Sequence, residues 1–177
     1  MSGHSHWAGI KHKKEATDQK RGKVFSKLLA AISAAAAAEQ NPDFNPRLRT
    51  AVQKAKDASV PIENIERAVK RASELNKDFE ELTFEAYGPG GSALIIEATT
   101  DNRNRTVAEV KKIINESSGK WAGAGSVTWI FKRGIQASEW KPKFTQKLSE
   151  EDKNKLKGLT DALEEHGDVQ KVYTNAG

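Results

Sequence analysis

The sequence predicts an α+β protein, with an N-terminal three-helix domain followed by a ferredoxin-like two-layer α/β domain. Apolar residues recur at helical spacing in three stretches over residues 15–75, and Pro residues separate these stretches. Beyond residue 81, short alternating and apolar runs predict strands in the order β-β-α-β and then β-α-β. We therefore expect a basic arm and helical domain over residues 1–76, and the ferredoxin-like domain over residues 77–177.

The first helix is expected from Glu15 to Glu39. Residues 1–14 show no clear hydrophobic period, and "NPDFNP" at residues 41–46 ends the helix. The apolar positions within the helix follow the spacing i, i+3, i+4, i+7 and i+11 of one face. These positions are Phe25, Leu28, Leu29, Ile32 and Ala36.

Two shorter helices complete the first domain. Asn45 is a residue type that caps helices and Pro46 suits the first helical position, so a second helix is expected from there to about Ala58. Pro61 opens a third helix with an apolar side and a basic outer side. The outer basic residues are Arg67, Lys70 and Arg71. Residues 73–81 are expected to be a polar linker.

A hairpin and a helix open the second domain. Residues 82–88 and 92–100 read as strands that are joined by a Gly-Pro-Gly-Gly turn. Thr106 and Glu109 have the spacing of a capping box, which predicts a helix over residues 107–117.

The remaining elements complete the sheet. Residues 126–134 are expected as a strand, and residues 138–144 as an edge strand, because Pro142 cannot donate a ladder hydrogen bond. Ser149 caps a last helix, and residues 168–174 form the final strand. We expect both helices on one face of a single mixed sheet, which leaves the other face available. The side chains expected on one side of the third strand are Val127, Trp129 and Phe131.

The net charge of +5 is concentrated at the start of the chain. Residues 1–27 hold seven Lys and Arg against two acidic residues, whereas the rest of the chain is balanced. A basic end on a neutral body suggests a polyanionic partner, and a solvated tail is the alternative. Cys is absent, and no stretch is long and apolar enough to span a bilayer. We expect a cytoplasmic monomer without membrane contact, or a mitochondrial matrix protein if the source is a eukaryote.

The sequence shows no catalytic or cofactor motif. It lacks the nucleophile-elbow, zinc-protease and phosphate-loop patterns. His4, His6 and His12 lie close together, but a flexible cluster without Cys or an acidic partner is a weak metal site. A copper(II) or nickel(II) site at a processed Ser-Gly-His terminus is the sharper alternative. We expect a non-enzymatic protein without cofactor, catalytic residues or metal site.

Nucleic-acid binding has the most support in the residues. The basic arm combines lysines with an aromatic ring that can stack on a base and a histidine that can donate hydrogen bonds. "DNRNRT" at residues 101–106 lies between a strand end and a helix start, where backbone N–H groups, Arg and Asn can hold phosphate. The structural alternatives are an arm that packs on its own domain and a loop that only shapes the turn. The candidates are Trp7, Lys11, His12, Lys13, Lys14, Lys20, Arg21, Lys23, Asn102, Arg103, Asn104 and Arg105, with Arg67, Lys70 and Arg71 as lesser ones.

Seven stretches, taken together and in order, resemble the YebC/PmpR family, which includes the mitochondrial translational activator of cytochrome oxidase subunit one. They are "GHSHWAGIKHKK", "DQKRGKVFSKL", "NPRLRTAVQKAK", "PIENIERAVKR", "YGPGGSALIIEATTDNRNRTVAEVKKI", "GSVTWIF" and "DALEEHGDVQKVYTNA". The resemblance implies a helical amino-terminal domain, a two-layer α/β domain and a role in regulating gene expression.

The sequence departs from the family pattern at several points. His6 and Gly9 stand where the family usually has lysine and asparagine, and Trp121 and Ala122 stand where leucine and glycine are usual. The chain is also shorter than typical members, which carry a third domain between the two β-α-β halves. We expect that insert to be missing near residues 134–138.

The resemblance implies two kinds of function. Bacterial members are described as DNA-binding transcriptional regulators, whereas the mitochondrial member points to translation, through mRNA or the ribosome and relief of stalling. No helix-turn-helix reading helix is apparent. We expect a nucleic-acid-binding regulator of gene expression, first as a DNA-binding transcriptional regulator and alternatively as a ribosome- or mRNA-associated translation factor. A protein-interaction module, docking on the sheet face or the acidic last helix, is the second alternative.

Overall fold

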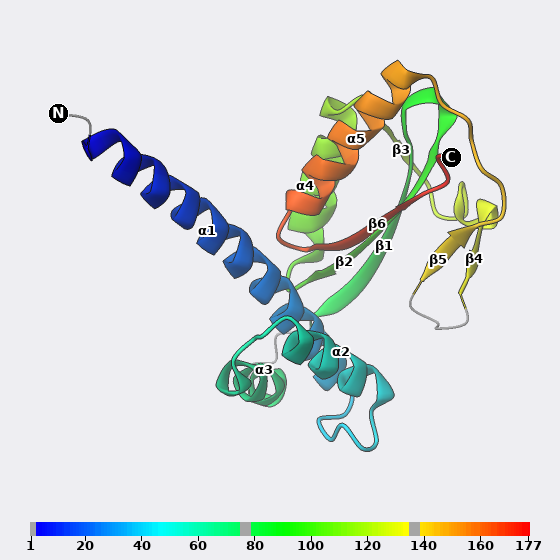
Figure 1. The fold of residues 1–177 in the computed structure, drawn as a ribbon. Coiled ribbons are helices and arrows are strands. Elements are labelled where there is room, and N and C mark those ends of the chain that lie inside the picture. Colours follow the sequence, from blue (N-terminus) through cyan, green and yellow to red (C-terminus); the bar gives the residue numbers. More distant parts are fainter. Residues whose placement is uncertain (1–2, 75–78, 135–138) are drawn as a thin grey trace. The chain divides into compact units, whose positions relative to one another are not determined.

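The computed structural model describes the backbone of residues 3–74, 79–134 and 139–177 (Figure 1). Side chains are described from Lys14 onward within these ranges, apart from residues 73 and 74. The chain divides into two compact units, Met1–Lys77 and Asp78–Gly177. Within the described ranges, no helix combines the length and apolar character needed to cross a bilayer.

The first unit contains three helices around one small core. The helices are α1 (Gly3–Ala36), α2 (Pro46–Asp57) and α3 (Ile62–Glu74). The second half of α1 packs on α2 and α3, and its residues Ile32 and Ala36 are fully buried together with Leu48 of α2. Ser33 of α1 ties this core to α3, because its hydroxyl donates to the carbonyl oxygen of Ala68 at 3.1 Å.

Helix α1 is longer at its start than the sequence predicts. It begins at Gly3 rather than Glu15, and it ends at Ala36 rather than Glu39. A hydrophobic period arises only where a helix face packs on something. Residues 14–24 are exposed on every side of the helix, so this part of α1 has no packed face that could leave a period in the sequence.

The predicted cap of α2 is confirmed, and it also joins α1 to α2. The Asn45 side-chain oxygen accepts from the backbone N–H of Leu48 at 3.0 Å. Its amide nitrogen donates to the carbonyl oxygens of Ala35 at 2.8 Å and Glu39 at 2.7 Å. Because Asn45 is only 7% exposed, these groups have little access to water as a substitute.

The second unit confirms the two-layer α/β domain, with a different sheet from the one expected. The sheet order is β3-β1-β2-β6, and all three neighbouring pairs are antiparallel, so the expectation of a mixed sheet is wrong. β1 lies between β2 and β3, which flank helix α4 in the chain, and this gives the split β-α-β arrangement of ferredoxin-like folds. The elements are β1 (Glu80–Tyr87), β2 (Ala93–Thr100), α4 (Arg103–Glu116), β3 (Lys120–Ala122), α5 (Glu150–Glu165) and β6 (Val169–Thr174).

The two faces of this sheet bury separate cores. Figure 1 shows α4 and α5 on one face, where Leu94 and Ile96 of β2 pack with Leu159 of α5. On the other face, Ile95 packs with Val127 and Phe131. The expectation that this second face stays available is therefore wrong, because the segment after β3 covers part of it.

The expected strand over residues 126–134 is also corrected. It is a short 3-10 helix, η2 (Thr128–Ile130), followed by β4 (Phe131–Arg133). β4 pairs with β5 (Trp140–Pro142) in a two-stranded sheet of its own, so β5 does not form an edge of the main sheet. The helical turn breaks the alternation of a strand, and Trp129 consequently points outward with 61% of its surface exposed.

The loop before η2 is organised by Glu85 of β1. The Glu85 carboxylate accepts backbone N–H bonds from Gly125 at 2.6 Å, Val127 at 2.7 Å and Thr128 at 2.9 Å. Burial by itself would raise the pKa of Glu85, but the hydrogen bonds from Thr128, Val127 and Gly125 outweigh burial and hold the pKa below its ordinary value. Glu85 thus stabilises the folded state in its ionised form.

We expect Asn45→Ala to destabilise the first unit by about 2–3 kcal/mol, because it removes a helix cap and leaves two carbonyl groups without their donor. Gln53→Ala on α2 is the matched control, since Gln53 donates only to the exposed side chain of Asp57. Urea unfolding followed by circular dichroism measures both variants. Equal effects of the two substitutions would contradict the role assigned to Asn45.

We expect the advantage of wild type over Glu85→Gln to depend on pH. A carboxylate with a lowered folded pKa contributes its full stabilisation above its unfolded pKa of about 4.3, and loses it as pH falls through the folded value. The difference in unfolding free energy between wild type and Glu85→Gln should therefore be largest near neutral pH and shrink below about pH 4. Exposed Glu165→Gln on α5 is the control. A difference that stays constant down to pH 3 would show that the ionised carboxylate is not what matters.

Candidate nucleic-acid interface

The first half of α1 is a helix without a packed face. In Figure 1 α1 extends well past α2 and α3, and all side chains from Lys14 to Val24 are exposed. Packing on the core begins at Phe25 and continues through Leu28 and Leu29. A helix that is polar on all sides gains nothing from burial within its own domain, so this stretch is available for contact with another molecule.

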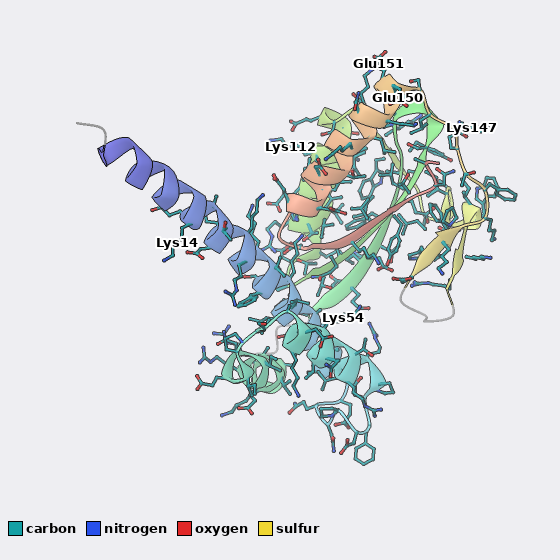
Figure 2. The ribbon with its side chains drawn as sticks, viewed as in Figure 1. Lys14, Lys54, Lys112, Lys147, Glu150 and Glu151 are labelled. Carbon is teal, nitrogen blue, oxygen red and sulfur yellow. The ribbon has the colours of Figure 1, made fainter. Side chains whose placement is uncertain are left out.

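Basic side chains dominate this exposed stretch. At 3.6 residues per turn, Lys20, Lys23 and Lys27 lie within about 60° of one another, on the side opposite Ile32 and the core. Arg21 lies nearer the packed side, with its guanidinium 5.2 Å from the centroid of the Phe25 ring. Figure 2 shows the side chain of Lys14 extending outward from the helix.

Four candidates of the arm are placed only by their backbone. Trp7, Lys11, His12 and Lys13 belong to α1, but their side chains lie outside the described residues. Their role in binding and the packing of Trp7 stay predictions.

The charge of the first unit extends beyond α1. Residues 1–77 contain fifteen Lys and Arg against eight Asp and Glu, a net charge of +7, whereas residues 78–177 carry −2. On α3, Arg67, Lys70 and Arg71 are all exposed, while Ile65 and Ala68 face the core. The outer side of α3 thus carries these three basic residues together with exposed Glu63 and Glu66, and their contact with nucleic acid stays a prediction.

The Asn and Arg residues of the "DNRNRT" loop are largely engaged within the second unit. Asn102 caps α4, because its side chain accepts from the backbone N–H of Arg105 at 3.1 Å. Arg103 pairs with Glu80 of β1 at 2.9 Å. Asn104 is exposed beside these two residues. The structural contribution of the loop is thus clear, and its contact with nucleic acid stays a prediction.

Arg105 and Asp168 form the centre of this network. Arg105 reaches Asp168 at 2.9 Å and Asp101 at 3.1 Å, and these contacts raise the pKa of Arg105 above its ordinary value. Burial would raise the pKa of Asp168, but hydrogen bonds from Thr106 and Arg105 outweigh it and lower the pKa. The charge of Arg105 is consequently balanced by two carboxylates, which compete with any phosphate for its donors.

The predicted capping box at Thr106 is wrong. α4 begins at Arg103, three residues before Thr106, so Thr106 lies inside the first turn of the helix. Its side chain is fully buried, and its hydroxyl lies 2.6 Å from the Asp168 carboxylate and 2.8 Å from the Thr100 hydroxyl. Contacts with Asp168, just before β6, and with Thr100 of β2 therefore decide the role of Thr106, and the sequence near α4 gives no sign of them.

In the described part of the chain, one group of side chains has the composition of a metal site. Ligand atoms of Glu109, His166 and Asp168 lie within 4.8 Å of one another. The His166 Nδ1 atom accepts the backbone N–H of Asp168 at 3.1 Å, which leaves the proton on Nε2 to be donated to Glu109 at 2.8 Å. Neither ring nitrogen then has a lone pair for a metal, so hydrogen bonding accounts for this cluster.

A groove of about 500 Å³ runs beside the edge of the main sheet. It is lined by Arg103 and Asn104 of α4 and by the Phe84 and Trp121 rings, whose centroids are 5.2 Å apart. The Glu85 carboxylate at this groove is already used by the loop over residues 125–128. The groove thus offers no pair of free acid and base groups for catalysis among its lining residues.

Two sequence profiles of one family match the chain. The TACO1/YebC protein N-terminal domain matches residues 5–75. The TACO1/YebC second and third domain matches in two pieces, residues 79–138 and 134–176. The two pieces overlap at residues 134–138, the position at which the family insert is expected to be missing.

Curated relatives carry the description "Probable transcriptional regulatory protein". One from Chloroherpeton thalassium is 56% identical over 136 residues, which cover 75% of this chain and 54% of the relative. The matched part thus spans about half the length of that relative. One from Solibacter usitatus is 37% identical over 235 residues, covering 99% of this chain and 95% of the relative.

A solved structure has the same fold over nearly the whole chain. It is the crystal structure of a conserved hypothetical protein from Aquifex aeolicus, with a TM-score of 0.83 and 35% identity. The match covers 97% of this chain and 96% of that chain. Profiles, relatives and structure agree, and the chain belongs to the TACO1/YebC family.

Proposed function

We propose that the protein is a non-enzymatic regulator of gene expression that binds nucleic acid through the basic side of α1. The names of its curated relatives support a regulatory role. The observation that carries the proposal is the exposed stretch of α1 from Lys14 to Val24, which has no packed face and presents four basic side chains, those of Lys14, Lys20, Arg21 and Lys23. The proposed place of action is the cytoplasm or, in a eukaryote, the mitochondrial matrix.

Lysines on a projecting helix suit phosphate contact. Each lysine that meets a phosphate releases counterions, so affinity falls steeply as salt rises. Lys20, Lys23 and Lys27 lie along one side of α1, at spacings that place them on successive turns. The exposed groups Arg67, Lys70 and Arg71 of α3 are proposed as further phosphate contacts in the same unit.

The loop over residues 101–105 is proposed as a secondary contact only. Arg103 and Arg105 would have to share their donors with Glu80, Asp101 and Asp168. On α1, by contrast, the side chains of Lys20 and Lys23 are exposed to solvent. Binding energy is therefore assigned first to α1.

The target proposed first is DNA, in keeping with the transcriptional description of the relatives, and RNA of messengers or ribosomes is the alternative. Phosphate contacts position a protein but do not read sequence. The lysines of α1 suit either polymer, so direct comparison of the two on one protein discriminates between them.

The structure gives less support to a protein-interaction module. Part of the sheet face that this reading requires is covered by η2, β4 and β5. On α5, Glu150 pairs with Lys153 at 2.8 Å and Glu151 pairs with Lys155 at 2.6 Å. Both glutamates lie in the first turn of α5 and are labelled in Figure 2. These pairs reduce the acidic character that would attract a basic partner.

We expect the double variant Lys20→Glu/Lys23→Glu to weaken binding to duplex DNA and to RNA by at least about tenfold, because two phosphate contacts are replaced by repulsion. The slope of log affinity against log salt should fall by about two, one for each lost contact. Fluorescence anisotropy with labelled duplex DNA and labelled single-stranded RNA, at several salt concentrations, measures both quantities. The polymer that the wild type binds more tightly at physiological salt identifies the target class.

The matched control is Lys111→Glu/Lys112→Glu on α4. It makes the same change of net charge on an exposed helix of the second unit, where Lys112 is labelled in Figure 2. If the control weakens binding as much as the α1 variant, general charge explains the affinity and the assignment to α1 fails.

A further inference from the structure

Two large aromatic side chains are exposed side by side in the second unit. Trp129 of η2 and Phe144, which follows β5, each expose 61% of their surface. Their ring centroids are 6.4 Å apart, and the planes are inclined at 54°. Tyr87 at the end of β1 is 38% exposed. Exposed aromatic groups of this size on a soluble domain indicate a contact surface.

A hydrogen bond to the loop before η2 holds the Trp129 ring in place. Its indole N–H donates to the Ser126 carbonyl oxygen at 2.9 Å, and the Tyr87 hydroxyl donates to the same oxygen at 3.2 Å. The three backbone N–H bonds to Glu85 fix the loop that carries Ser126. Because the only polar group of the indole is already satisfied, the ring presents an apolar face in a fixed orientation.

Three lysines belong to the segment that carries the two rings, and one of them, Lys143, contacts the backbone of Trp129. The Lys143 backbone N–H donates to the Ile130 carbonyl oxygen at 2.8 Å, and its ammonium group donates to the Trp129 carbonyl oxygen at 2.9 Å. Lys132 of β4 and Lys141 of β5 are direct cross-strand partners, and both are exposed. Within the described ranges neither has an ion-pair partner, and two like charges in such a position repel each other.

The local charge contrasts with that of the rest of the unit. Residues 120–147 hold six Lys and Arg and a single acidic residue, whereas the unit as a whole carries −2. Repulsion between Lys132 and Lys141 is relieved when an anion binds beside them. The segment that carries the two exposed rings is therefore also a basic segment of the unit.

We propose that Trp129 and Phe144, with Lys132, Lys141 and Lys143, form a platform that stacks the unpaired bases of a single-stranded nucleic acid. Every base has a π face, so stacking on aromatic rings tolerates any sequence, and lysines beside the rings hold the backbone. A duplex hides its base faces and cannot use the rings. A second copy of the chain would bring lysines against lysines, which disfavours self-association through this surface.

This platform goes beyond the proposed function and does not depend on it. It lies in the second unit and uses none of the residues of α1. If one of the two binding surfaces is disproved, the other can therefore still hold. The two can be told apart because the platform requires single-stranded nucleic acid, whereas the lysines of α1 also suit a duplex.

The test is anisotropy of a short labelled oligouridine and of a labelled duplex, with the full chain and three variants. Trp129→Ala should weaken oligouridine binding by about tenfold, since stacking contributes about 1–3 kcal/mol per base. Phe144→Ala should weaken it by a similar factor, and Trp129→Tyr should retain most of the affinity because tyrosine still stacks. Duplex binding should be unchanged in all three variants.

Phe44→Ala is the matched control, because Phe44 is 77% exposed and belongs to the first unit. Thermal unfolding confirms that each variant is folded. Unchanged oligouridine affinity in folded Trp129→Ala, or an equal loss for oligouridine and duplex, overturns the platform. Loss of a concentration-dependent dimer in Trp129→Ala, with unchanged oligouridine affinity, overturns it in favour of a second copy as the occupant. If Lys20→Glu/Lys23→Glu has no effect but Trp129→Ala still weakens oligouridine binding, the α1 proposal fails and the platform stands.

Discussion

The second unit depends on one strand, β2, that is buried on both faces. Leu94 and Ile96 pack under the helices, and Ile95 between them packs on the opposite face, all without exposed surface. Full burial of such a side chain contributes about 1.5–3 kcal/mol, so neither face can stay open to water without large cost. The segment after β3 must therefore return across the sheet, and Val127 and Phe131 supply the second cover.

This covering segment explains the surface that results. Once Val127 and Phe131 turn inward, the intervening turn η2 directs Trp129 outward. Glu85 stabilises that path by accepting three backbone N–H bonds from a loop some 40 residues further along the chain. Trp129 is thus exposed because the segment around it covers the second face of the sheet. The Glu85 carboxylate fixes the position of that segment.

Local signals made much of the fold predictable. Asn45 and Ser149 cap the helices that they were expected to cap, and Leu156, Leu159 and Leu163 form the buried side of α5. The predictions that were wrong concern residues whose partners are far away in the sequence. Asn102 and Thr106 are both residue types that cap helices, and the Thr106 hydroxyl is instead engaged by Thr100 and by Asp168, 62 residues away. The strand pattern at residues 126–134 likewise gives no hint of Glu85, which turns that segment into a loop and a 3-10 helix.

The candidate interface, like the fold, was predictable from the sequence only in part. Charge counting along the sequence located the basic arm, because charge excess is a property of composition. The sequence could not show that α1 continues through the arm, since a helix without a packed face leaves no hydrophobic period. Nor could it show that Arg105 is balanced by Asp168, 63 residues away. Hydrogen–deuterium exchange of the full chain, with and without nucleic acid, tests the central claim most directly. The account predicts that amides of residues 14–24, in an exposed helix, exchange fast in the free protein and slowly when DNA or RNA is bound. Unchanged exchange over these residues at saturating nucleic acid would contradict it.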